Sequence, residues 1–301
     1  MKALEKISPS QLFCILLLTH TAAGIIRPEN GGCGAAALTA IILAEVVRFA
    51  LALPIVIFAF RGESFYGAMN KRSRPLAIAA AILAVLLLLG YALSTIMNTA
   101  EFVQRNILAG ASALLTVAMI AAFAVYLLFS GVQAAARAGV LFLVLAGVVT
   151  LTVMLASIPH FRTQQLLPQW QEDEFVSELT YRLMDGGEYL ILAALLPHTN
   201  NRSHGAGKAA LWLALCGTLA AVIICVFCRL TLGEFSAFAE YPFAAASSLA
   251  DIALIKRLDG ITCAVWALAG AFRTGLLLLS AWAAVKAILP QNAVAARKES
   301  A

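Results

Sequence analysis

The stretch Pro75–Ala100 reads PLAIAAAILAVLLLLGYALSTIMNTA and contains no charged side chain. At about 1.5 Å of rise per residue, a helix of this length crosses the hydrocarbon core of a bilayer, which is about 30 Å thick. A soluble fold rarely contains so long an uncharged run, because its exterior has to be polar. The stretch therefore predicts a transmembrane helix.

Charge-poor segments continue on both sides of this stretch. Backbone groups cannot remain unpaired in lipid, so we expect helices, and the short alternating segments of a membrane barrel are not found in the sequence. The expected fold is an all-α, polytopic bundle of about eight spans. The other spans are Ile7–Ile26, Ala35–Phe60, Asn106–Ala136 (leaving the membrane near Ser130–Gly131), Ala138–Ile158, Glu178–Pro197, Ala209–Cys228 and Gly260–Leu289.

The overall composition agrees with a membrane bundle. Hydrophobic residues make up 62% of the 301 residues, charged residues make up 12%, and the mean hydropathy is +0.90. We expect a single transmembrane domain over residues 1–301. P-loop, GxSxG, HExxH and Rossmann motifs are not found, so the sequence predicts neither an enzyme nor a cofactor. The net charge of +5 is not arranged as a basic patch with interleaved aromatics, and we expect no nucleic-acid partner.

The six cysteines mostly lie inside apolar runs, where cysteine behaves as a small hydrophobic residue. Cys225 and Cys228 form a lone CxxC, without a second pair or a neighbouring histidine cluster. The sequence therefore predicts no metal site and no redox site.

The distribution of basic residues predicts the topology. With the N-terminus in the cytoplasm, twelve Lys and Arg residues lie in cytoplasmic segments and seven in outer segments. Basic residues are enriched in cytoplasmic loops. An even number of spans then places both termini in the cytoplasm.

Charges within spans are costly in lipid and usually face a cavity or a partner. Glu45 and Arg48 are three residues apart and share a helical face. They form either a structural ion pair or part of a path for ions or water. Arg273 is a further partner, either for Glu45 or for Glu188.

The segment Asp185-Gly186-Gly187-Glu188 has two interpretations. Two glycines weaken a helix by about 1 kcal/mol each, and broken helices form binding sites in many transporters. Alternatively, Asp185 lies at the outer interface and the sixth span begins there. At the end of the first span, Thr21 and Gly24 belong to a stretch of small residues that permits either close packing or unwinding.

Several stretches resemble one family. The most specific is Lys256–Trp266 (KRLDGITCAVW), and looser matches are Lys6–Phe13, Gly24 with Pro28, Gly90–Tyr91, Phe161–Pro168, and Leu232, Glu234 and Pro242. In these residues the chain resembles the permease-like B subunit of spore germinant receptors (GerAB type), within the amino acid/polyamine/organocation transporter superfamily.

The resemblance implies an inverted-repeat (LeuT-like) fold, here shortened at the C-terminus because the family usually has ten spans. It implies a membrane subunit that senses a small germinant, an amino acid, during spore germination. The shortened second repeat puts transport in doubt more than sensing. The alternatives are an amino acid transporter of the same superfamily and a scaffold subunit without a ligand.

The resemblance also implies a ligand site between the first and sixth spans. In this chain it would comprise Thr21, Gly24, Gly186, Gly187 and Glu188, with Glu188 contacting an amine or a coupled proton. The implied partners are a receptor A subunit, a C-subunit lipoprotein and the lipid bilayer. The implied location is the bacterial cell membrane or the spore inner membrane.

Overall fold

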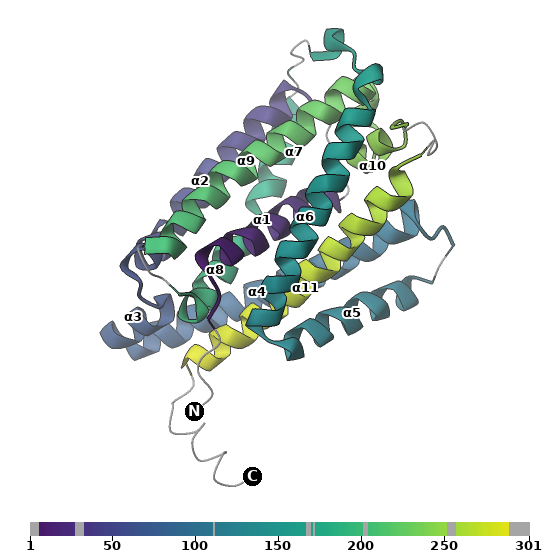
Figure 1. The fold of residues 1–301 in the computed structure, drawn as a ribbon. Helices are drawn as coiled ribbons and strands as arrows, with labels where there is room; N and C mark the ends of the chain where they lie inside the picture. Colours follow the sequence, from purple (N-terminus) through teal and green to yellow (C-terminus); the bar gives the residue numbers. More distant parts are fainter. Residues whose placement is uncertain are drawn as a thin grey trace.

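The computed structural model describes residues 6–27, 33–110, 112–166, 170, 172–200, 204–251 and 257–288. Within these ranges the secondary structure is helical, apart from one isolated bridge between Ile7 and Thr199. The helices form a single layered bundle (Figure 1). This arrangement confirms the predicted all-α membrane fold.

Six helices in the described residues are long and apolar enough to cross a membrane. They are α2 (Ala35–Arg61), α4 (Arg74–Asn106), α5 (Ala113–Ser130), α6 (Val132–Ala156), α9 (Gly205–Leu232) and α11 (Asp259–Ile288). The first predicted span is the shorter α1 (Pro9–Ile25), and the predicted sixth span is split into α7 (Glu172–Leu183) and α8 (Gly187–Leu195). Together these elements occupy the eight predicted positions.

Short elements connect the long helices. Two are α-helices, α3 (Phe65–Arg72) and α10 (Pro242–Ser247). In the part of the chain that the structure describes, four more are 3₁₀ turns: η1 (Ile158–His160), η2 (Thr163–Leu166), η3 (Leu196–His198) and η5 (Gly233–Ala237).

The predicted boundaries of the fourth and fifth spans were wrong. Asn106 is the last residue of α4, and α5 ends at Ser130, so the fourth span is shorter than Asn106–Ala136. The fifth begins at Val132, six residues before the predicted start. Gly131 separates them with a φ of +87°, a conformation that glycine adopts without steric cost. Hydropathy does not detect such a turn, because both sides of it are equally apolar.

The core of the bundle lies around α11. In its apolar window 67% of the residues are buried, against 33% or less in the other five long helices. It packs against α1, α4, α5, α6 and α8. The outer helices instead expose large apolar side chains, such as Leu51 (76% exposed), Leu114 (78%) and Phe129 (83%). Such a surface is stable in lipid rather than in water, so the chain is an integral membrane protein.

The two terminal helices meet at one end of the bundle. The start of α1 and the end of α11 lie near each other in Figure 1. The backbone of Ile7, just before α1, bonds to His198 and Asn200 after α8. A chain that crosses the membrane an even number of times has its first and last helices end on the same side, as they do here. The side of the membrane on which this end lies stays a prediction.

Candidate functional site

The predicted sixth span is broken in its middle. Met184, Asp185 and Gly186 lie between α7 and α8 and are not helical. A Cβ atom at Gly187 would lie 3.1 Å from Leu277 Cδ2 and 3.4 Å from Tyr91 Cδ2, so the chain passes close to α11 and α4 here. The structure thus shows a break between α7 and α8, and the second interpretation, with Asp185 at the outer interface, stays a prediction.

The carboxylate of Asp185 pairs with the guanidinium group of Arg273 on α11. Only 2% of the Arg273 side chain is exposed, against 25% for Asp185. Arg273 Nη1 also donates to the carbonyl oxygen of Thr19 on α1, at 3.2 Å. The break is therefore tied to both α11 and α1.

A chain of ion pairs continues from Arg273 toward α2. Its Nη2 lies 3.6 Å from Glu188 Oε1, and Glu188 Oε2 lies 2.5 Å from Arg48 Nη2. Arg48 Nη1 lies 3.2 Å from Glu45 Oε2, and the Tyr189 hydroxyl donates to Glu45 Oε1 at 3.0 Å. Glu45 and Arg48 thus pair with each other, and Arg273 joins them through Glu188.

These five ionisable residues carry an excess of negative charge. Three are acids and two are bases, so the formal charge is −1. Among the described residues, Glu188 Oε1 and the Nε atoms of Arg48 and Arg273 are buried without a hydrogen-bond partner. Buried charges of this kind in a membrane usually mark a ligand or ion site, and the net charge favours a cationic group.

Two adjoining pockets contain residues of this cluster, and a third adjoins one of them within the described residues. The wide pocket, about 220 Å³, lies between α1, α4, α7 and α11. Its polar lining includes Arg27, Tyr91, Asn98, Tyr181, Asp185 and Arg273.

The narrow pocket, about 30 Å³, lies between α1 and α7 and is lined by Gly24, Arg48, Glu178, Arg182, Asp185 and Glu188, among others. It shares Ala23, Arg27, Tyr181 and Asp185 with the wide pocket.

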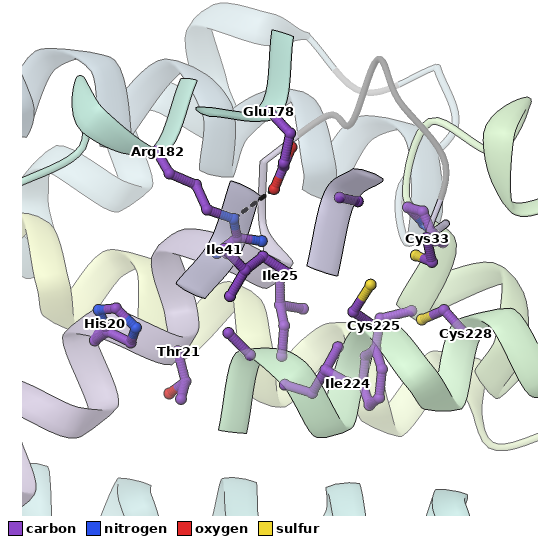
Figure 2. A pocket seen from close by; sticks show the side chains of 15 residues that line it. His20, Thr21, Ile25, Cys33, Ile41, Glu178, Arg182, Ile224, Cys225 and Cys228 are labelled. Carbon is purple, nitrogen blue, oxygen red and sulfur yellow. Dashed lines mark hydrogen bonds and ion pairs between the residues drawn. The ribbon is translucent and has the colours of Figure 1, made fainter. Parts of the chain in front are cut away.

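The thiol pocket, about 40 Å³, lies on the other side of α1, toward α2 and α9 (Figure 2). Its lining includes Thr21, Cys33, Ile41, Ile224, Cys225 and Cys228. It adjoins the narrow pocket at His20, Gly24 and the ion pair of Glu178 with Arg182, whose atoms are 2.5 Å apart.

The predicted ligand residues lie around this set of pockets without meeting in one of them. Gly24 and Glu188 share the narrow pocket, whereas Thr21 lines the thiol pocket. Gly186 and Gly187 form the break and pack toward Tyr91. The α1 helix is unbroken, so the structure does not show the unwinding alternative. A Cβ atom at Gly24 would meet nothing within 4 Å, because this residue borders the pockets. The Thr21 hydroxyl donates to the carbonyl oxygens of Leu17 and Leu18.

Sequence reasoning missed Arg27 and the side chain of Asp185 as site residues. The Arg27 guanidinium carbon lies 2.8 Å from the centre of the Tyr181 ring, and its Nη1 donates to the Tyr181 carbonyl oxygen at 3.1 Å. Arg27 ends the apolar first span, a signal that marks a candidate. The common pocket of Arg27 and Asp185 depends on contacts between α1 and α7, which the sequence does not show.

Helices broken beside buried charged groups form the binding sites of many membrane transporters. Residues 6–295 match the family described as spore germination protein. The chain therefore belongs to the spore germination protein family of permease- and receptor-type membrane proteins, and membership supports a role in spore germination and transport. No curated protein matches the chain.

Proposed function

We propose that the chain is the membrane subunit of a spore germinant receptor, and that it binds a small zwitterionic germinant, an amino acid, at the break between α7 and α8. One observation supports this most strongly. The carboxylate of Asp185 and the guanidinium groups of Arg27 and Arg273 line one pocket beside a broken helix. A zwitterion presents the complementary charges.

The charges divide the roles within the wide pocket. The excess negative charge of the cluster favours the ammonium group of the ligand near Asp185. Arg27 would take the carboxylate, because within the described residues it makes no ion pair and is held by the ring and carbonyl of Tyr181. A buried water needs about 10–15 Å³, so 220 Å³ has room for a small amino acid.

The five residues implied by the family resemblance stand in different relations to this position. Gly186 and Gly187 would offer backbone groups at the start of α8. Glu188 would act through Arg273 and Arg48 or hold a coupled proton. Gly24 would border the ligand only through the adjoining narrow pocket, whereas Thr21 lines the thiol pocket on the other side of α1 and would not contact the ligand.

The proposed setting is the spore inner membrane, with both termini in the cytoplasm. The proposed partners are the receptor A subunit and the C-subunit lipoprotein. Their co-purification with this chain from spore membranes tests the assignment as a receptor subunit.

Ligand-dependent thermal unfolding of the purified complex tests the binding site. We expect an amino acid to raise the Tm of the wild type, Arg27→Gln to abolish the rise, and Glu188→Gln to reduce it. Arg105→Gln is the control, because Arg105 is an exposed arginine on α4 outside the pockets. If no amino acid raises the Tm of the wild type, or if the Tm of Arg27→Gln rises as much as that of the wild type, the proposed site is wrong.

A helix break of this kind suits a transporter equally well. Accumulation of labelled amino acid in proteoliposomes under an ion gradient would identify an amino acid transporter instead. A scaffold subunit would assemble and signal normally after Asp185→Asn and Glu188→Gln are combined.

A further inference from the structure

Three cysteine thiols from two distant parts of the chain meet at one end of the thiol pocket. Cys33 precedes α2, and Cys225 and Cys228 lie one turn apart on α9. In Figure 2 their sulfur atoms lie at the same end of the pocket. Their exposed fractions are 4%, 6% and 1%, respectively. The fold therefore adds a third thiol to a CxxC that the sequence showed without a second pair.

Hydrogen bonds hold Cys33 beside the last turns of α9. The Cys33 backbone N–H donates to Ser236 Oγ at 3.4 Å, and that hydroxyl donates to the carbonyl oxygen of Gly233, the C-cap of α9, at 2.6 Å. The next backbone N–H, of Gly34, donates to Glu174 Oε1 at 3.0 Å. Cys228 is the thiol of α9 nearer to this end of the helix.

Helix geometry decides which thiols can form a disulfide. Residues three apart on a helix have Cβ atoms about 5–6 Å apart, whereas a disulfide needs about 3.5–4.5 Å. Cys225 and Cys228 lie inside the unbroken α9, so a bond between them would distort the helix. The fixed spacing within one helix does not apply to a bridge from Cys33, which lies outside α9 and lines the same pocket.

We propose that Cys33 and Cys228 form a dithiol site that oxidants of the peroxide class convert into a disulfide. One sulfur attacks the peroxide, the O–O bond breaks, and a sulfenic acid and one water form. The second sulfur displaces the hydroxyl group of the sulfenic acid as a second water. Two thiols lose two electrons and two protons, and the peroxide is reduced to two waters.

The pocket gives the oxidant access to both sulfurs. About 40 Å³ holds roughly three water-sized groups, and hydrogen peroxide has two heavy atoms. The other cysteines, Cys14, Cys216 and Cys263, do not line the thiol pocket. The bridge would join the segment before α2 to α9, next to the Glu174 contact with α7, and would restrain this corner of the bundle.

Counting thiols in the purified full chain tests the proposal. The protein is treated with hydrogen peroxide, unfolded and alkylated with N-ethylmaleimide. Its intact mass then gives the number of cysteines that have reacted with maleimide. The untreated protein has six, and the oxidised protein should take four maleimides and regain six after dithiothreitol. Peptide mapping should identify Cys33 linked to Cys228. Six maleimides after oxidation, or four without this linked peptide, would overturn the proposal.

Two variants separate this site from general oxidation. Cys33→Ala should take five maleimides both before and after oxidant. Cys216 also lies on α9 but outside the pocket. The number of maleimides that Cys216→Ala takes should therefore fall from five before oxidation to three after it. Cys228→Ala serves as a second test if Cys33→Ala does not fold, and it should likewise keep five. A linked pair in either pocket variant would overturn the assignment to Cys33 and Cys228.

Discussion

Arg273 on α11 pairs with Asp185, a residue that belongs to no helix. A buried guanidinium group in a membrane requires a partner of opposite charge, and the break between α7 and α8 brings that partner into reach. The two glycines after Asp185 weaken the helix locally, and the ion pair to α11 stabilises the broken form. Sequence and tertiary contact therefore act together at this point.

Asp185→Asn should destabilise the protein by up to about 3 kcal/mol, because removing one partner leaves Arg273 buried with a weaker contact to Glu188. Unfolding in detergent with a chemical denaturant measures the change. Asp251→Asn is the control, because Asp251 is exposed and lies outside the helices. Equal unfolding midpoints for the two variants would show that the Asp185 pair contributes nothing.

Tyr189→Phe should cost about 1.5–3 kcal/mol, the usual value of a hydrogen bond to a charged group. The ring keeps its packing, and only the hydroxyl donor to Glu45 is lost. Tyr126→Phe removes a hydroxyl from a tyrosine that is 68% exposed and should leave the unfolding midpoint unchanged. The same measurement gives both values, and the prediction fails if Tyr189→Phe matches this control.

Gly139→Ala should destabilise the protein by about 1–3 kcal/mol through overpacking. A Cβ atom there would lie 2.5 Å from Ile15 Cγ2 and 2.8 Å from Phe272 Cζ, where α6 approaches α1 and α11. Gly147→Ala is a matched control on α6, since a Cβ atom there meets nothing within 4 Å. The control should be neutral or stabilising by up to about 1 kcal/mol. A neutral Gly139→Ala would show that α6 can move away without cost.

The sequence predicts what depends on residues close together in the chain. Hydropathy located the six described helices that are long and apolar enough to cross a membrane, together with the shorter α1. The spacing of Glu45 and Arg48 predicted a shared face. The two glycines after Asp185 made a break one of two interpretations. Each of these signals lies within a single continuous segment of the chain.

The remaining features of the site depend on contacts between distant segments. Glu188 lies 140 residues from Arg48 and pairs with it, and Asp185 lies 88 residues from Arg273. Cys33 reaches α9 only through the packing of the segment before α2. Local propensity contains no information about such pairings, so the wide pocket and the thiol pocket could not be predicted from one sequence.

Glu240→Gln should change stability little, in contrast to Asp185→Asn. Glu240 Oε2 lies 2.9 Å from Arg105 Nη1, but the two side chains are 37% and 55% exposed, and Arg105 keeps a second partner in Glu101. Exposed pairs contribute little and are screened by salt. The unfolding midpoints are measured at low salt and at about 1 M salt, where the Debye length is about 3 Å. In high salt the midpoints of Glu240→Gln and the wild type should coincide. The deficit of Asp185→Asn should persist there, because a buried pair is screened much less. A deficit of Glu240→Gln that survives high salt would mean that this contact does more than pair two exposed charges.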